Sequence, residues 1–412
     1  MANTLGVYNP TYYAQEALIW LSKALGLGNS VHVGFDEERR AFNRGDVISI
    51  RRPSVLTVSD GGSAAQDLNT ETVSLTLDKW REVRFTLSDK ELAFTGPNTM
   101  DNPIIRDHIM PAAYALADDV DQKLAELVVQ VPHAYGEPSG ASAATIAGIL
   151  KTDRALFDLK CPTKDERNMF FMIGGSEHAD LAALAAFSQW QGAGPAGAAT
   201  QMNNQLGQRY GYNFFRNQNR TTQAYANITD FAGAINGAVA KGVTTLVVDA
   251  LGTSDVLNKG TILKFTSGAE LGNQYTLTAN ATMSTGAGSL LITPALRVGA
   301  ADNDTFAIGD LAALNQGAAG TGLQDSVTNN LNLAFHRSFA ALAMARLPDF
   351  GEHANKLGAN IVSVQDPVTG LAMRSRIHYL GATSKIEVVL DIVYGVKMLN
   401  PDLACRYELV NT

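Results

Sequence analysis

The spacing of apolar residues along this chain switches between the period of a helix and the period of a strand. Steps of three and four positions predict helices over residues 11–25, 103–131, 142–159 and 325–347. The second of these would be about 40 Å long at the 1.5 Å rise per residue of an α-helix. A further helix is predicted over "SEHADLAALAAF", with Ser176 as its N-cap. Strand patterns lie between these helices, so we expect a mixed α+β fold.

Strict alternation marks the stretch that follows residue 72. Val73, Leu75 and Leu77 would lie on one side of a strand, with polar residues on the other side. The run "GDVISIRRPSVLTV" before it is also strand-like, and the polar stretch "SDGGSAAQDLNTET" separates the two. Two long strands joined by a polar tip predict an extended β-arm. Such an arm buries little within its own chain, so we expect it to lie on a neighbouring copy.

A third pattern, of short strands at even spacing, fills residues 243–310. Glycine, asparagine and aspartate turns separate the strands, which predicts a small barrel or sandwich. The period returns to a helical one afterwards, as expected for a domain inserted into a loop of another domain. We expect four apolar residues to fill the core of this insertion: Leu263, Phe265, Tyr275 and Leu277. Long strands over 358–364 and 371–396 follow further along the chain.

Length and charge limit the function classes. A chain of 412 residues has room for two or three domains. Its net charge of -8 argues against a surface that grips nucleic-acid phosphates, which requires clustered Lys and Arg. Cys161 and Cys405 form no CxxC pair, and we expect them to be buried structural thiols. We find no apolar run long enough for a membrane helix, so we expect synthesis in the cytoplasm.

Catalytic signatures are missing from the sequence. It has no P-loop, HExxH, GxSxG or EF-hand pattern. Ser176, His178 and Asp180 lie within one helical turn and point in different directions, so we interpret them as a helix cap with solvated neighbours rather than a catalytic triad. The acidic residues at 118, 119 and 121 splay around a helix, and we interpret them as a surface patch. We therefore expect no enzyme, no cofactor and no metal.

The order of these parts resembles the major capsid protein of tailed bacteriophages, with the Hong Kong 97 type of fold. It is similar to the podovirus-like branch that carries an inserted β-domain. Four stretches carry the resemblance: "TETVSLTLDKWREVRFTLSDKELAF", "LGQRYGYNFFRNQN", "AFHRSFAALAMARLP" and "VVLDIVYGVKMLNPDLACRYEL". They resemble the return strand of the E-loop, the segment before the insertion, the helix after it and the C-terminal strand. None is a catalytic motif.

The resemblance implies a division of the chain into six parts. These are an N-terminal arm (1–44), an E-loop β-arm (45–85), a peripheral domain with the spine helix (86–135), a first part of the axial domain (136–227), the inserted β-barrel-like domain (228–315), and a last part (316–412). The last part would hold the rest of the axial domain and the C-terminal strands of the peripheral domain. Relatives with a fused scaffold carry a long helical segment before the arm, so we expect a separate scaffolding protein here.

The implied function is structural. Copies of the chain would assemble as hexamers and pentamers into an icosahedral head in the host cytoplasm, enclosing double-stranded DNA without binding its sequence. A portal protein would be a further partner, and a decoration protein stays an open question. We expect inter-subunit contacts at two tryptophans and three charges of the arms: Trp20, Trp80, Arg81, Glu82 and Arg84. Packing within the chain is the alternative for the tryptophans.

Two other functions remain open on the sequence. The β-domain could belong to a binding protein of a phage tail or host surface, or the chain could form an encapsulin-like compartment shell. The size of the particle separates the first of these from a capsid, since a coat protein forms large closed shells and a binding protein forms small oligomers.

Overall fold

The computed structural model describes residues 10–33, 47–52, 71–88, 90, 103–137, 142–189, 200–226, 228–308, 326–349, 359–366 and 370–411. The chain divides into two compact units. The first comprises residues 1–121 and 340–399, and the second comprises residues 122–339 and 400–412. The domain limits predicted from the sequence are not tested by this division and stay predictions. Both units combine helices with largely antiparallel sheets, which agrees with the predicted α+β class.

The first unit is built on a six-stranded sheet around one long strand, β24 (Lys385–Met398). β24 pairs antiparallel with three other strands along its length, namely β4 (Lys79–Ser88), β23 (Ala372–Leu380) and β21 (Ala340–Ala345). β22 (Ala359–Gln365) continues the sheet beside β23, and the short β1 (His32–Val33) lies parallel to β21. Leu390 and Ile392 of β24 are almost fully buried, so the centre of this sheet is part of the core.

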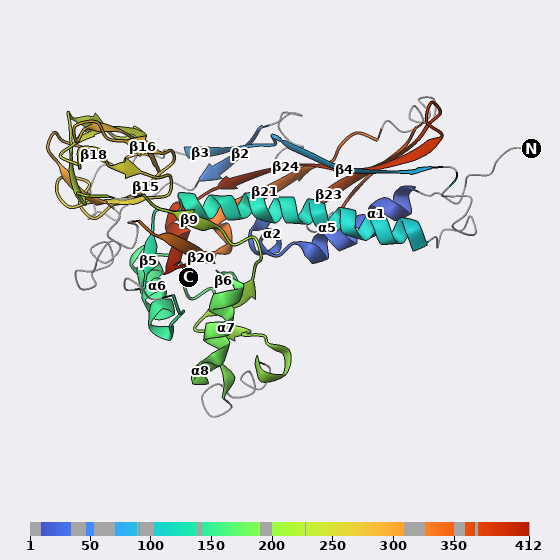
Figure 1. Cartoon of the computed structure of the whole chain (residues 1–412), viewed down its shortest axis with the longest axis horizontal. Helices are drawn as coiled ribbons and strands as arrows, with labels where there is room; N and C mark the ends of the chain where they lie inside the picture. Colours follow the sequence, from blue (N-terminus) through green and yellow to red (C-terminus); the bar gives the residue numbers. More distant parts are fainter. Residues whose placement is uncertain are drawn as a thin grey trace, which may run out of the picture. The chain divides into compact units, whose positions relative to one another are not determined.

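Helices of the first unit lie along one face of this sheet: α1 (Pro10–Ala24), the short α2 (Leu27–Ser30) and α5 (Pro103–Ala125) (Figure 1). α1 packs against β22 and β23. Ile109, Leu116 and Val120 of α5 are buried at helical spacing, which confirms the predicted long helix. A 3₁₀ turn, η1 (Glu126–Gln130), extends it to the limit expected from the sequence.

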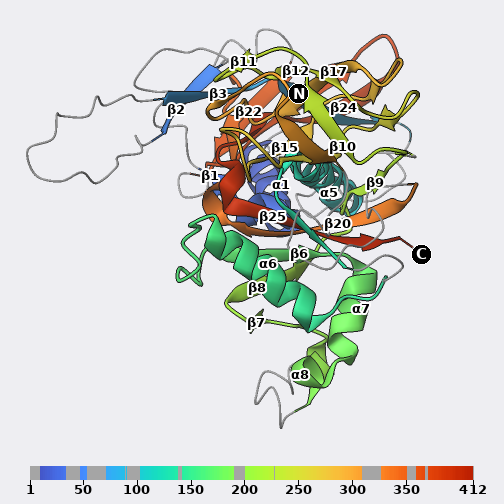
Figure 2. The same cartoon turned by 90° about the vertical axis from the view of Figure 1, so that its left-hand side faces the viewer.

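The second unit contains a seven-stranded sheet. Its order is β5 (Ala134–Gly136), β25 (Ala404–Val410), β20 (Thr328–His336), β6 (Met169–Ile173), β8 (Tyr212–Arg216) and β7 (Gln208–Arg209), with β9 (Thr222–Ala224) beside β20. Three helices pack on it through a shared core that includes Ile149, Leu181 and Phe187 (Figure 2). They are α6 (Ile146–Asp158), α7 (Gly175–Ala183) and α8 (Ala185–Ser188). Thr145 caps α6 by accepting a hydrogen bond from the Gly148 N–H.

The helix predicted over 325–347 is wrong. This segment forms β20, the 3₁₀ turn η2 (Arg337–Phe339) and β21, and β20 and β21 belong to different sheets. Both strands are buried along nearly their whole length. In β20, Leu331, Leu333 and Phe335 alternate with Asn330 and Asn332, which are also buried, whereas β21 is an unbroken run of Ala, Leu and Met without a period of two. The many Ala and Leu residues then imitated a helical stripe.

Residues 228–308 of the second unit contain a closed six-stranded barrel between β9 and β20. Its strands in spatial order are β10 (Ala232–Ile235), β12 (Thr245–Asp249), β17 (Gly288–Thr293), β15 (Gln274–Leu277), β14 (Ile262–Phe265) and β19 (Thr305–Ile308). Two short strand pairs complete it: β11 (Val239–Ala240) with β18 (Gly299–Ala300), and β13 (Val256–Leu257) with β16 (Ala281–Thr282). The predicted run of short strands over residues 243–310 covers every strand of the barrel except β10, which was missed.

The barrel has a hydrophobic core of its own. All its buried members lie between Ile228 and Ile308, and they include the four predicted residues Leu263, Phe265, Tyr275 and Leu277. Each of these four side chains is at most 1% exposed. The rings of Phe265 and Tyr275 meet edge to face with centroids 5.8 Å apart.

The start of α7 differs from the prediction. Gly174 is its N-cap and no side chain caps the helix, while the Ser176 hydroxyl donates to the Glu177 carboxylate. His178 is buried rather than solvated, and Asp180 accepts a hydrogen bond from the Ala144 N–H. His178 thus belongs to the packed interior whereas Ser176 is exposed, and the structure gives no support to a triad.

Candidate functional site

The predicted β-arm begins as a hairpin of β2 (Val47–Arg52) and β3 (Glu71–Thr76). Ile48, Ile50 and Leu75 of the hairpin are buried against Ala341 and Ala343 of β21. The expectation that the arm buries little within its own chain is therefore wrong for this part of it. Alternating apolar residues here cover the chain's own sheet. The residues between β2 and β3 lie outside those that the structure describes.

A glycine lets the hairpin approach the sheet closely. A Cβ placed on Gly395 of β24 would lie 2.2 Å from the carbonyl oxygen of Thr76, where the hairpin crosses the sheet. No side chain fits at that distance, because the obstacle is backbone. The hairpin can therefore pack this closely on β24 only because residue 395 is a glycine.

The strand that follows the hairpin, β4, pairs with β24 and not with the hairpin. All ten residues of β4 pair with β24, from Lys79 opposite Tyr394 to Ser88 opposite Lys385. The prediction that residues 73–88 form one strand of the arm is therefore wrong after Thr76. The sheet-forming part of this stretch presents Trp80 on one face, and this side chain is 60% exposed.

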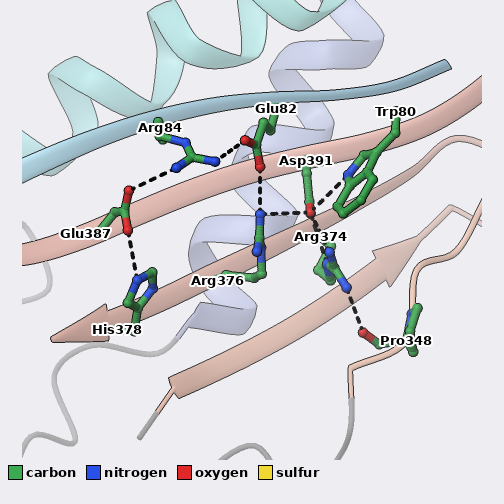
Figure 3. Close-up of polar contacts among 9 residues, drawn as sticks. All are labelled: Trp80, Glu82, Arg84, Pro348, Arg374, Arg376, His378, Glu387 and Asp391. Carbon is green, nitrogen blue, oxygen red and sulfur yellow. Dashed lines mark hydrogen bonds and ion pairs between the residues drawn. The ribbon is translucent and has the colours of Figure 1, made fainter. Parts of the chain in front are cut away.

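A ladder of charges runs across β4, β24 and β23 on the face that bears Trp80 (Figure 3). Its centre is Asp391, which is fully buried. Arg374 donates to both of its carboxylate oxygens, at 3.0 and 2.5 Å, and also donates to the Pro348 carbonyl at 3.2 Å. Arg376 and the Trp80 indole nitrogen lie 3.3 and 3.4 Å from Asp391 Oδ2. Several donors therefore surround the buried carboxylate.

The ladder becomes solvent-exposed toward β4. Arg376 donates to Glu82 at 2.8 Å, and Arg84 bonds the other oxygen of Glu82. The Arg84 guanidinium lowers the pKa of Glu82, with a smaller effect from Arg376. Further along, Glu387 lies 3.7 Å from Arg84 and 2.8 Å from His378 Nε2. Opposite charges thus face each other between neighbouring strands, which favours this register of β4, β24 and β23.

Arg81 points to the opposite face, where α5 lies. Its Nε donates to Asp119 at 3.1 Å, and the same carboxylate accepts the Tyr394 hydroxyl at 2.6 Å. The Asp119 carboxylate raises the pKa of Arg81, and burial raises that of Tyr394. The three charges predicted as inter-subunit pairs, Arg81, Glu82 and Arg84, thus have partners within their own chain. A role in contacts between copies stays a prediction.

Trp20 and Trp80 are not brought together. Trp20 lies on α1, with its ring centroid 6.1 Å from that of Tyr114 on α5 and with the Lys23 ammonium 4.9 Å from its centre. Ile19 and Tyr114 beside it are 53% and 43% exposed. Trp80 lies on the face that bears the charge ladder. The first unit therefore carries a tryptophan on each side of its sheet, of which Trp80 is the more exposed.

No family model matches the sequence, and no curated protein matches it. The chain is similar to solved capsid structures. "Mycobacterium phage Che8" is 14% identical, with 93% of this chain and 90% of that chain covered and a TM-score of 0.44. "Capsid of Ralstonia phage GP4" is 10% identical, with 90% and 85% covered and a TM-score of 0.44.

A further similar structure is titled "Crystal structure of virus-like particle from Pyrococcus furiosus". It is 9% identical, covers 96% of this chain and 98% of that chain, and has a TM-score of 0.35. At these identities and TM-scores the likeness is weak, so the function proposed below rests on this chain's own residues.

The residues that matter most for the charge ladder were missed by the sequence reasoning. Arg374 and Asp391 belong to a hairpin of β23 and β24, and their positions opposite each other follow from its register. Asp121 was interpreted as part of a surface patch, but it is buried and accepts the N–H groups of Gly26, Leu27 and Gly28. Burial raises its pKa. Its partners lie more than 90 positions away in the sequence, so spacing gives no signal for it.

The described residues offer no other chemistry. Within them, no group of three or more His, Cys, Asp or Glu side chains could hold a metal ion. No helix in this part of the chain is long and apolar enough to cross a membrane. Cys161 and Cys405 are buried free thiols, as expected, and burial raises the pKa of each to about 12. The candidate site on these residues is therefore the charge ladder together with the exposed Trp80.

Proposed function

We propose that this chain is a major capsid protein, which assembles as hexamers and pentamers into an icosahedral phage head around double-stranded DNA. The observation that carries the proposal is the order of the elements. A helical arm, a hairpin, a return strand and a long helix precede a second sheet, and a closed barrel is inserted between β9 and β20 of that sheet. This order follows the one that the sequence resemblance implies, except that strands β20 and β21 stand where it implies a helix after the insertion.

The surfaces of the first unit support contacts between copies. Trp80 is 60% exposed beside a charge ladder that fixes it in place, and its indole nitrogen is the part that faces the chain's own Asp391. Tryptophan and arginine are the residue types that contribute most at interfaces. We assign Trp80 and Trp20 as anchors for neighbouring copies, with the β2–β3 hairpin and α1 supplying the rest of the contact area.

The charge of the chain suits a container. With a net charge of -8, the protein has no excess of cations to hold DNA, so the genome can be enclosed without being gripped. A separate scaffolding protein and a portal protein complete the proposed assembly. Co-expression with and without the neighbouring phage genes tests the scaffold: uniform closed shells from this chain alone would refute the need for one.

Particle size tests the proposal itself. Purified chain, alone and with its neighbouring gene products, would be examined by light scattering and negative-stain electron microscopy. Closed shells of uniform diameter support a coat protein. Small oligomers under all conditions would instead support a binding protein that carries a β-barrel.

A further inference from the structure

The barrel is held against the sheet of its own unit by side chains that come much later in the sequence. Arg297 of the barrel forms an ion pair with Asp402, 105 positions further along the chain. Asp402 lies in the 3₁₀ turn η3 (Pro401–Leu403), immediately before strand β25. A second bond comes from β25 itself, where Arg406 donates to the Gly260 carbonyl at 3.0 Å.

His133 joins the first of these contacts. Its Nε2 lies 3.0 Å from Asp402 Oδ1, and its Nδ1 lies 3.2 Å from the Gln274 side-chain oxygen on β15. Asp402 therefore bridges the barrel and the segment before β5. Hydrogen bonds from His133 and Arg297 hold the pKa of Asp402 well below its usual range, against the effect of burial.

The Arg406 contact is fully buried. Arg406 is 0% exposed and forms an ion pair with Glu408 at 3.2 Å, and Glu408 also accepts from Asn329 at 2.9 Å. Gly260, whose carbonyl Arg406 holds, has a φ of +91° and lies against Val129 of η1. Ile262 of β14 is buried with Ala134 of β5. The β14–β15 side of the barrel thus faces the sheet through the apolar contact of Ile262 with Ala134 and through polar contacts that include Arg406 with Gly260 and His133 with Gln274.

The barrel needs none of these residues for its own core, because every buried member of that core lies between Ile228 and Ile308. We infer that Asp402 and Arg406 act as a clasp: the barrel forms its own core, and its orientation on the sheet is fixed by the segment that carries η3 and β25. In a shell, identical orientation of every barrel would let all copies make the same contacts, so this inference deepens the proposed function.

Pulsed EPR on the unassembled full-length chain tests the clasp. Spin labels would be attached at Ser289→Cys on the barrel and Asp158→Cys at the end of α6, both exposed positions. We expect one narrow distance distribution without further changes. Arg297→Gln and Asp402→Asn each remove one side of the ion pair and should broaden it, and the double variant should broaden it little more than either alone. Lys123→Gln, which removes an exposed pair with Glu126 in the same unit, should leave it narrow.

Unchanged narrow distributions in all three clasp variants would overturn the inference. Arg297 is 35% exposed at its side chain, so its replacement is not expected to unfold the unit, and circular dichroism of the labelled proteins checks this. The measurement needs no shell. A failure of the clasp therefore appears as an unchanged distance, whereas a failure of the proposed function appears as absence of particles from the unaltered protein.

Discussion

Arg374 and Asp391 form a doubly hydrogen-bonded ion pair inside the six-stranded sheet, with Nε 3.0 Å from Oδ1 and Nη2 2.5 Å from Oδ2. Both side chains are buried, and they stand opposite each other on β23 and β24. This pair lies at the centre of the charge ladder, and the Trp80 indole lies beside it (Figure 3). The rigidity of the proposed contact surface therefore depends on a pair that solvent does not reach.

Removing one partner of this pair should be costly. We expect Arg374→Ala to lower the free energy of unfolding by about 3–5 kcal/mol, because Asp391 would stay buried without its main partner. Arg346→Ala is the matched control, since its pair with Asp349 is exposed, and it should cost less than about 1 kcal/mol. Urea unfolding of both variants measures the difference. Equal, small losses would contradict this view of the ladder.

A methyl group at Gly395 should dislodge the hairpin. Gly395→Ala would place its Cβ 2.2 Å from the Thr76 carbonyl, so β3 must move away from β24. We expect faster hydrogen exchange in β2 and β3 and a loss of about 1–3 kcal/mol in stability. Gly381→Ala, which meets no atom within 4 Å, is the control and should change neither. If the two variants behave alike, the close approach of Thr76 to Gly395 is not what holds the hairpin on the sheet.

Acid should loosen the barrel. The pKa of Asp402 is lowered in the folded chain, so its contribution is full above the ordinary aspartate pKa of about 4 and declines as the pH falls below it. We expect the EPR distance distribution between barrel and α6 to stay narrow from pH 7 down to about 4 and to broaden as the pH falls further. Asp402→Asn should already be broad at pH 7 and show less change with pH. If the distance distribution of the wild-type chain does not change with pH over this range, the result would argue against the ion pair of Arg297 with Asp402.

Trp80 should matter to assembly more than to the subunit. Because its side chain is 60% exposed, Trp80→Ala should change the unfolding free energy of the unassembled chain by less than about 1 kcal/mol. It should nevertheless lower the yield of shells and their resistance to denaturant. Tyr379→Ala is the control, as this ring is 53% exposed on the same sheet. Shells that form and persist normally without Trp80 would remove it as an anchor.

The sequence pattern predicted correctly the elements that bury one face and expose the other. The barrel strands and the hairpin have one buried face, so the period of two is visible in Val73, Leu75 and Leu77 and again around Leu263 and Phe265. β21 is apolar on both faces, so no period of two is visible there, and a helix was predicted over β20 and β21 although Leu331, Leu333 and Phe335 of β20 do alternate with polar residues. The hydrophobic periodicity of a segment therefore shows which of its faces are buried more directly than it shows whether the segment is a helix or a strand.

Charged residues of the site could not be predicted in the same way. Asp121 resembles its neighbours at 118 and 119 in the sequence, yet its carboxylate is buried against backbone N–H groups of residues 26–28. Only the packing of α5 beside α2 decides this. Likewise, Arg81, Glu82 and Arg84 look like free charges on an arm until the register of β4 with β24 places Arg376 and Asp119 next to them.

The most direct test of the proposed function is the size of the assembled protein. The chain would be co-expressed with its neighbouring phage genes, and the product analysed by sedimentation velocity and negative-stain microscopy. We predict closed icosahedral shells of uniform diameter, built from hexamers and pentamers of this chain. A product that stays monomeric or forms only small oligomers, with and without those genes, would contradict the assignment as a capsid protein.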